Sequence, residues 1–219
     1  MSGEKTITET RDVAGFEGVK LSGFGTVTIT QGDHTSLTIE AAEDVIKRVS
    51  SEVKKGVLVL GLKKGGWMLG LRQKKLSIKF SVTMENIRAL NLAGAGRIDA
   101  PSVETDTLSL VMSGSGAMDI GALQAESLSI VLSGAGNCAV AGRVATQSVV
   151  LSGAGNYVAP GLECEKASVV VSGVGNVTIH VKDTLDAKVS GAGNVRYDGA
   201  PTVRQRVTGV GSVKCTCND

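Results

Sequence analysis

The chain has 219 residues, a formal net charge of +2 and 42% hydrophobic residues, which allows a sizeable core and excludes a disordered chain. Glycine is frequent, with 29 residues, whereas aromatic residues make up only 3%. The interior must therefore be built from aliphatic side chains and tight backbone turns. No apolar run approaches the roughly 18 residues of a membrane helix. The first residues contain no apolar signal segment, so we expect a cytosolic protein or the mature form of a secreted one.

Residues 1–88 predict an irregular, β-rich N-terminal part. In residues 19–29, apolar and polar side chains alternate on both sides of Gly23 and Gly25, which is typical of two strands joined by a bend. Three further strand-like runs follow, at 36–41, 56–62 and 75–82, and residues 42–53 favour a short helix. We expect the 19–29 segment to form an early rung, and the rest of this part to pack on the regular structure or continue it.

A basic loop with apolar residues at its centre lies between two of these runs, at residues 62–76. Its candidate binding residues are Lys63, Lys64, Trp67, Met68, Arg72, Lys74 and Lys75. Exposed, such a loop would bind an anionic membrane surface or a polysaccharide. Buried, its apolar centre would cap an open end of the fold, with the lysines solvating the tip. Both interpretations stay open, and we expect no nucleic-acid binding because the chain is nearly neutral.

A Ser-Gly-x-Gly motif, with Ala or Thr in place of Ser in some copies, recurs every 18 to 20 residues in the remainder of the chain. The first glycines of the motif are Gly94, Gly114, Gly134, Gly153, Gly173, Gly191 and Gly209. Apolar residues stand two and four places before most of these glycines, and again four and six places after them. The pattern therefore predicts a strand, a glycine bend, a second strand and a variable return segment in each repeat.

Repeats of this length bury their apolar faces only by stacking on one another. The sequence therefore predicts an all-β fold, a single-stranded right-handed parallel β-helix of about seven rungs in residues 89–219. A leucine-rich repeat is excluded because the return segments are too short for helices. We expect a positive φ at the bends, so that Gly153→Val would be strained. We also expect Asn137, Asn156, Asn176 and Asn194, just after the bends, to form a hydrogen-bonded ladder.

One column that should face outward is apolar. It lies three places before the glycine and contains Val111, Val131, Val150 and Val170. Exposed apolar stripes are unusual on a solvated face. Either another part of the chain covers these valines, or they form a self-association surface, which would make the protein a homo-oligomer.

The candidate chemical groups are few. Asp99 and Asp119 occupy the same column and would be the carboxylates of a hydrolase or lyase, although solvated surface acids are the simpler interpretation. His34 and His180 have no Ser or Cys partner at a suggestive spacing. Cys138 falls in an inward column and Cys164 in a different column, so we expect no disulfide between them. For Cys215 and Cys217, a disulfide near the C-terminus and free thiols both stay open. We expect no catalytic residue, metal or cofactor.

Three stretches of the sequence resemble a known family. They are DVAGFEGVKLSGFGTVTITQGD, LTIEAAEDVIKRVSSEVKKGVLVL and the serial LSGAGN units, and together they cover nearly the whole chain. They are similar to the auto-transporter adhesin "head GIN" domain of bacterial envelope proteins. The resemblance implies a right-handed β-helix and a non-enzymatic, adhesin-like module of the cell envelope or exterior, which binds a glycan or a surface protein. The alternatives are a carbohydrate-active hydrolase or lyase and a self-assembling structural protein.

Overall fold

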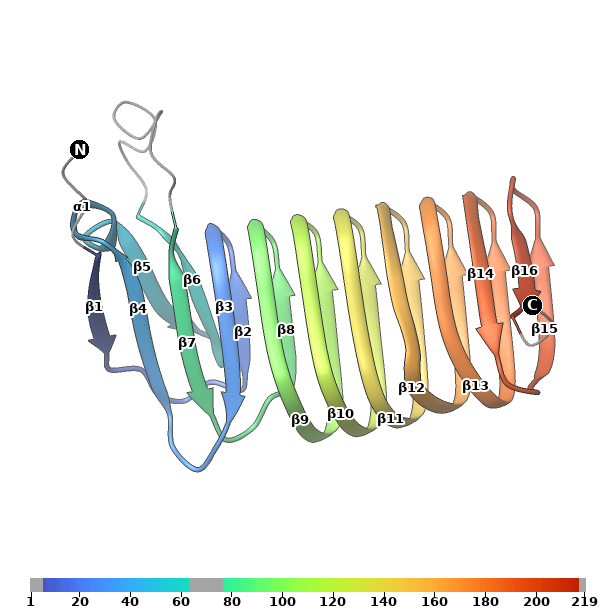
Figure 1. Ribbon diagram of the computed structural model, residues 1–219, viewed down its shortest axis with the longest axis horizontal. Coiled ribbons are helices and arrows are strands. Elements are labelled where there is room, and N and C mark those ends of the chain that lie inside the picture. Colours follow the sequence, from blue (N-terminus) through green and yellow to red (C-terminus); the bar gives the residue numbers. More distant parts are fainter. Residues whose placement is uncertain (1–5, 64–76, 217–219) are drawn as a thin grey trace.

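The computed structural model describes residues 6–63 and 77–216, and it is almost entirely β-structure. A parallel β-solenoid of about six turns extends from an N-terminal part of mixed strand direction (Figure 1). The predicted all-β parallel β-helix is thereby confirmed. The seven glycine bends predicted from the sequence delimit these six turns, since a turn runs from one bend to the next.

The N-terminal part and first turns are built from nine strands and one short helix. They are β1 (Thr6–Arg11), β2 (Gly18–Leu21), β3 (Phe24–Gln31), β4 (Ser36–Ala42), α1 (Glu43–Ile46), β5 (Val49–Lys54), β6 (Val57–Leu62), β7 (Lys79–Met84), β8 (Ala89–Leu92) and β9 (Ala95–Met112). The later turns comprise β10 (Ser115–Leu132), β11 (Ala135–Leu151), β12 (Ala154–Val171), β13 (Val174–Val189), β14 (Ala192–Asp198), β15 (Thr202–Val207) and β16 (Ser212–Cys215).

Each regular turn is one long strand that continues around the corners of the coil. The strands β9 to β13 are 16 to 18 residues long and pair in parallel with the turns before and after them. The return segments of variable length that we expected from the sequence are therefore part of these long strands and pair with the neighbouring turns. Small register shifts absorb the differences in repeat length, for instance between Ile120 and Leu123.

The core is a set of inward columns in which equivalent side chains of successive turns lie on top of one another. The column two places before the bend is 2% exposed or less from Leu92 to Val189. Burying this many aliphatic side chains, at about 25 cal/mol per Å² of apolar surface, is what stabilises the stack. The alternation read from the sequence gives these columns directly.

The glycine at each bend is required for close backbone approach, not for a left-handed conformation. None of the seven first glycines of the motif has a positive φ, so the predicted reason for their presence is wrong. At Gly153, a Cβ atom would lie far inside van der Waals contact of the carbonyl oxygen of Gly134 in the turn below. The amide of Ala154 donates to that same oxygen at 3.0 Å, which holds the two turns together at the bend.

The asparagines that follow the bends form the expected ladder. Asn156 donates its side-chain amide to Oδ1 of Asn137 at 2.9 Å, Asn176 to Asn156 at 3.1 Å and Asn194 to Asn176 at 3.2 Å. Ser212 closes the ladder by donating its hydroxyl to Asn194 Oδ1 at 2.9 Å. The ladder thus links four successive turns to the final strand.

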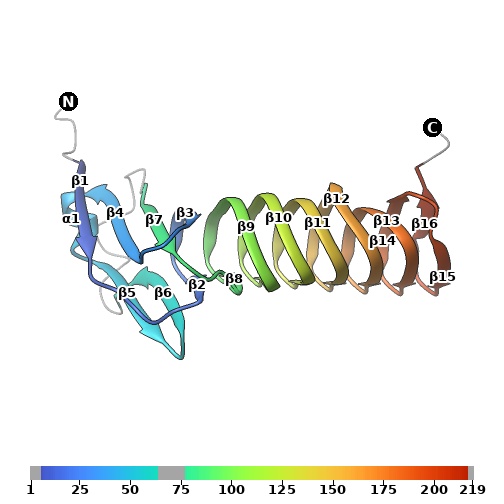
Figure 2. The same ribbon diagram turned by 90° about the horizontal axis from the view of Figure 1, so that it is seen from below.

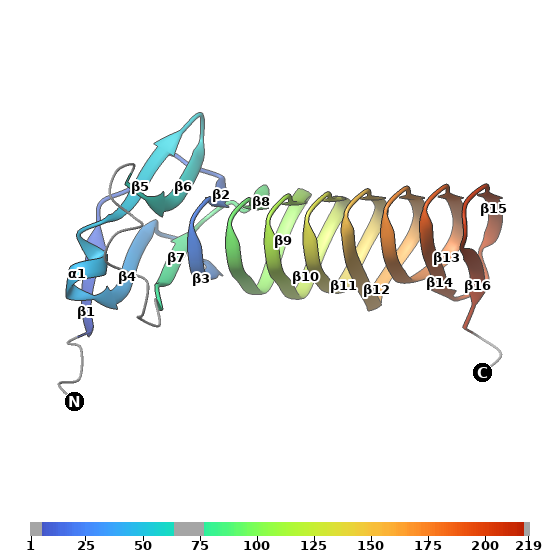
Figure 3. The same cartoon turned by 90° about the horizontal axis from the view of Figure 1, so that it is seen from above.

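The N-terminal part completes the stack and closes its first end. Strands β2 and β3 pair in parallel with β8 and β9, so they occupy the place of an additional turn. Beyond them, β4 and β1 add antiparallel strands to one sheet and β5 adds one to the other. The β5–β6 hairpin projects sideways from the axis of the solenoid (Figures 2 and 3). The helix expected at 42–53 is a single turn, α1, because the following residues pair as β5.

One arginine ties the two sheets of this N-terminal part together. The guanidinium of Arg11 donates to the carbonyl oxygens of Val49 and Ile46, at 3.0 and 3.3 Å, and to Oγ of Ser51 at 3.1 Å. It also pairs with Glu9 at 2.8 Å. The part that lacks the regular repeat is therefore held by a specific polar contact.

Candidate functional site

The basic loop lies mostly outside the described residues. This applies to Lys64, Trp67, Met68, Arg72, Lys74 and Lys75. Lys63 is described: it is exposed and its Nζ donates to the carbonyl oxygen of Lys47 at 3.0 Å. Binding and capping by this loop both stay predictions.

The four valines of the outward column lie side by side in successive turns, as the strand register requires. Each is partly buried, and the column continues to Asn91 before Val111 and to Lys188 after Val170. Self-association through this column stays a prediction. Light scattering of the wild type and of Val131→Lys tests this prediction by measuring the mass of each protein in solution. A wild-type oligomer that the substitution dissociates would support self-association, and a monomeric wild type would contradict it.

The two aligned carboxylates do not form an acid–base pair. Arg97 lies between them, with its Nε 2.7 Å from Asp99 and a terminal nitrogen 2.7 Å from Asp119. The hydrogen bond that Arg97 donates to Asp99 and the charges of both carboxylates raise the pKa of Arg97, which keeps the three groups as an ion triad. Both carboxylates are bound by the same arginine, which is the arrangement of an ion triad and not of a separate acid and base.

The cysteines and histidines also lack a catalytic arrangement among the described residues. Cys138 and Cys164 are free and buried, and burial raises the pKa of Cys138 to about 12, which keeps its thiol protonated and unreactive. Cys215 is disulfide-bonded. His34 and His180 pair with Asp33 and Asp198, each at 3.1 Å.

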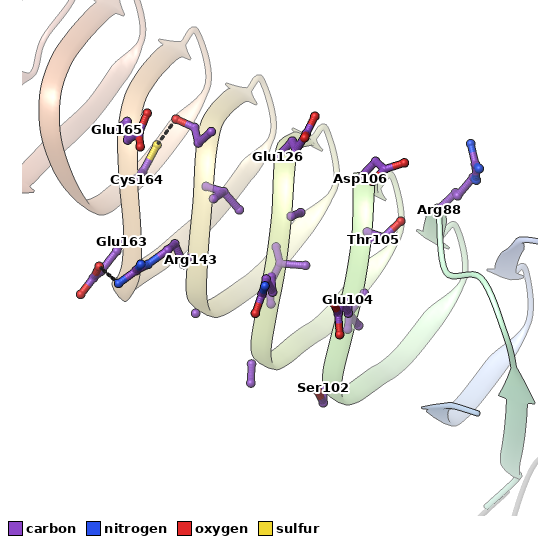
Figure 4. A pocket seen from close by; sticks show the side chains of 18 of the residues that line it. Arg88, Ser102, Glu104, Thr105, Asp106, Glu126, Arg143, Glu163, Cys164 and Glu165 are labelled. Atoms are coloured by element: carbon purple, nitrogen blue, oxygen red, sulfur yellow. Dashed lines mark hydrogen bonds and ion pairs between the residues drawn. The ribbon is translucent and has the colours of Figure 1, made fainter. Parts of the chain in front are cut away.

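A groove of about 930 Å³ runs along the solenoid and crosses β9, β10, β11, β12 and the middle of β13. Its floor is formed by small side chains and backbone at Thr105, Ala125 and Cys164. Two outward columns form its walls, since residues on either side of an inward position point outward in a strand. Figure 4 shows Asp106, Glu126 and Glu165 along one wall, with Glu104 and Glu163 along the other.

The charges of this groove are unbalanced. Its three cations are all paired with carboxylates of the chain: Arg143 with Glu163 at 3.0 Å, Lys182 with Glu163 at 2.8 Å, and Arg88 with Glu17 at 3.1 Å. The hydrogen bond from Lys182 lowers the pKa of Glu163 and keeps it ionised. Four further carboxylates have no ion pair with a described residue: Glu104, Asp106, Glu126 and Glu165.

The residue pattern of the repeats does not reveal this groove. The repeat motif is marked by glycine and asparagine, and no acidic residue recurs with it. The signal that could have revealed the groove is the register, because Asp106, Glu126 and Glu165 share one column, interrupted at Ala145. Assigning that column requires the exact number of residues in each corner, which the variable repeat length hides.

Two general features of the described chain bear on its chemistry. Within residues 6–63 and 77–216, no group of three or more His, Cys, Asp or Glu side chains is arranged to hold a metal ion. In the same residues, no helix is long and apolar enough to cross a membrane.

Solved structures show the same fold over almost the full length of the chain. A protein from Bacteroides fragilis NCTC 9343 described as a putative adhesin has 24% identity and a TM-score of 0.88, and the match covers 97% of this chain and 98% of that one. A putative adhesin from Parabacteroides merdae ATCC 43184 has 19% identity and a TM-score of 0.75, covering 97% and 96%. A putative lipid binding protein from Parabacteroides distasonis ATCC 8503 has 20% identity and a TM-score of 0.75, covering 96% of each chain.

At these identities the structural matches establish the fold alone. No curated protein matches the chain by sequence. A family model does match, over residues 15–201, which spans the early turn and most of the solenoid. The chain belongs to the family described as putative auto-transporter adhesin, head GIN domain.

Proposed function

We propose that the protein is a non-enzymatic, adhesin-like module of the bacterial cell envelope, which binds an extended segment of a protein partner in the groove across β9 to β13. The observation that carries this proposal is the charge of the groove. Every cation in it has a carboxylate partner, with Arg143 and Lys182 sharing Glu163, whereas four carboxylates have no ion pair with a described residue, so carboxylates outnumber cations in the lining. The groove is therefore complementary to a partner that carries lysine or arginine side chains.

The shape of the groove supports an extended partner. It crosses five successive strands of the solenoid, and strands in one sheet lie roughly 4.8 Å apart. Because successive turns pair through parallel ladders, the backbone that carries the groove is held in place, and little backbone entropy is lost in the protein on binding.

The lining argues for a protein rather than a neutral glycan. None of the described residues that line the groove is aromatic, so no ring is available to pack against a sugar face. The role as an adhesin-like module and the place in the envelope are supported by the family description. The absence of enzymatic activity is supported by the ion triad at Arg97, which occupies the two carboxylates that a hydrolase or lyase would use.

The test compares binding to immobilised ten-residue peptides, alternating in Lys and Thr or in Glu and Thr, with binding to a glycan array. We expect retention on the Lys peptides, weakened by salt. The double variant Asp106→Asn, Glu126→Gln should bind them at least fivefold more weakly. The matched control is Asp12→Asn, an exposed aspartate at the other end of the chain with no ion pair to a described residue.

Two results would overturn the proposal. Retention by neutral glycans that the groove substitutions leave unchanged would show that the partner is a glycan bound elsewhere. Turnover of a polysaccharide that Asp119→Asn abolishes would show that the protein is an enzyme.

A further inference from the structure

The last turn of the solenoid buries its inward face only in part. In the column two places before the bend, Val189 is 1% exposed, but its neighbour in β15, Val207, is 40% exposed. In the column two residues earlier, Ala187 is buried and its neighbour Gln205 is exposed. The first end of the solenoid is closed by antiparallel strands, whereas β15 pairs only with β13 among the described residues. One edge of β15 is therefore free to accept a strand.

This free edge is positively charged. Arg204 and Arg206 lie on the outward face of β15, and neither has an ion pair with a described residue. Arg206 lies directly beside Lys188 of the preceding turn, and adjacent like charges in neighbouring strands destabilise a sheet. The neighbouring edge strand β16 repeats the pattern, since Lys214 lies beside Arg196.

The contrast with the middle of the solenoid is informative. There, the like charges Asp99 and Asp119 are also adjacent, but Arg97 lies within 2.7 Å of both. At the last turn, Asp186 lies beside Arg204 but pairs with Lys188, at 3.9 Å, and no described carboxylate forms an ion pair with Arg204 or Arg206. A strand added to β15 with acidic residues facing outward would neutralise them, and its inward apolar side chains would cover Val207.

We propose that the edge of β15 is a docking site for an acidic, amphipathic β-strand of a partner protein, which adds to the sheet in the manner of β-augmentation. Main-chain hydrogen bonds along Thr202–Val207 supply affinity, and pairing with Arg204 and Arg206 supplies specificity. The strand alternates acidic and apolar residues, because outward and inward positions alternate along β15.

A second copy of this chain fits the site poorly. Two copies meeting through their last turns would bring the same cations together. At the opposite end, β1 pairs only with β4 among the described residues, and its single carboxylate, Glu9, is already paired with Arg11 at 2.8 Å. Cations on an edge strand also discourage pairing between identical chains, so they select an acidic strand as the partner.

The experiment uses the full chain and three fluorescently labelled ten-residue peptides, measured by fluorescence anisotropy. One peptide alternates Glu and Val, the second alternates Lys and Val, and the third alternates Glu and Pro. The third has the charge of the first, but proline removes the N–H donors of one strand edge and replaces the valines that would cover Val207, so it can add in one orientation at most and should bind more weakly. We expect the Glu/Val peptide to bind at least tenfold more tightly than either of the others.

The double variant Arg204→Glu, Arg206→Glu should lose at least tenfold in affinity for the Glu/Val peptide and should prefer the Lys/Val peptide. Arg48→Glu, an exposed arginine near the other end of the solenoid, is the control and should leave binding unchanged. A circular dichroism melt of each variant establishes that it is folded. Because the substitutions are on an exposed edge strand, we expect the solenoid to tolerate them.

Three outcomes would overturn the proposal. Equal binding of the Glu/Pro peptide would show that attraction is purely electrostatic. Unchanged binding in the double variant would place the peptide elsewhere, and a concentration-dependent mass that the double variant abolishes would show that β15 pairs with a second copy. The groove is lined by other strands up to Lys182, so either proposal can fail without the other.

Discussion

The regular turns from β8 to β14 and the N-terminal part from β1 to β7 bury their cores by different means. In the regular turns, each strand contacts the equivalent strand one repeat away, and the same kinds of residue meet at every level. In the N-terminal part, strands far apart in sequence pair antiparallel, as β1 does with β4, and Arg11 bridges the two sheets. The turns therefore depend on the fit between repeats, whereas the N-terminal part depends on a few specific contacts.

This difference predicts where damage spreads. A substitution that separates two turns interrupts every ladder between them, because the strands are continuous around the coil. A substitution in the N-terminal part should loosen that part and leave the middle of the solenoid intact, since in repeat structures each unit contacts only its neighbours. The following predictions test this comparison.

The largest effect is expected at a bend of the regular turns. In Gly153→Ala, the new Cβ would clash with the carbonyl oxygen of Gly134, and backbone cannot move aside as a side chain can. We expect the free energy of unfolding in urea to fall by about 3 kcal/mol. The matched control is Gly161→Ala in β12, the strand that follows this bend, where a Cβ would meet only the Cβ of Ala141 at 3.4 Å. Equal melting of the two variants would contradict the close-approach explanation.

A smaller and more local effect is expected in the N-terminal part. Arg11→Ala removes hydrogen bonds to Val49, Ile46 and Ser51 and leaves their partly buried oxygens without this donor. We expect a loss of about 2 kcal/mol, because hydrogen bonds to charged groups contribute about 1.5–3 kcal/mol. Hydrogen exchange should show lost protection in β1, β4 and β5 but not in β10 to β12.

The control for Arg11 is another arginine of the same region. Arg88 forms an exposed ion pair with Glu17, and its side chain is 57% exposed. Arg88→Ala should cost less than about 1 kcal/mol, as surface ion pairs do. Loss of exchange protection in β10 to β12 of Arg11→Ala would show that the two regions unfold as one unit.

Within the regular core, one polar pair breaks the aliphatic pattern. The hydroxyl of Tyr157 donates to Oε1 of Gln147 at 3.2 Å, and both residues are buried. Burial raises the pKa of Tyr157 well above its usual value, so the hydroxyl remains a donor. Nε2 of Gln147 has no hydrogen-bond partner among the described residues. In the column of Gln147, the neighbouring turn carries Leu128.

A double-mutant cycle measures this pair. Tyr157→Phe and Gln147→Leu each leave the other polar group unpaired and should each cost about 1–3 kcal/mol. The double variant should recover most of that loss, because replacing both partners by apolar groups can be nearly neutral. Urea unfolding of the four proteins gives the coupling. Simple additivity of the two losses would show that the pair contributes nothing beyond its separate residues.

The sequence predicts these two regions unequally, for a physical reason. The solenoid columns follow from apolar alternation around a recurring glycine, so Leu92, Leu132 and Val189 could be placed inside without a structure. The N-terminal pairings could not, because β1, β4 and β7 are short strands whose partners lie in distant segments. The groove was also missed, since its carboxylates align only once the corner lengths are known. The seven bends were located correctly, yet close approach rather than a positive φ explains the first glycine of each motif, while the second glycine Gly116 does have a positive φ, of 140°.

The smallest effect is expected from lengthening the asparagine ladder by one turn. The asparagine ladder ends at Asn137, whose neighbour in the preceding turn is Ala117. The side-chain bonds of the ladder run in one direction, with each amide donating to the turn before it, and the amide of Asn137 donates to no described residue. In Ala117→Asn, the new Oδ1 accepts a hydrogen bond from the amide of Asn137, and we expect the free energy of unfolding to rise by about 0.5–1 kcal/mol after the cost of ordering the side chain.

Ala117→Leu is the control for side-chain volume alone, and the gain should vanish when Asn137→Ala is combined with Ala117→Asn. A gain that survives in that combination would mean that the new residue stabilises the turn without the ladder, and the ladder would then be a consequence of the stacking rather than one of its causes.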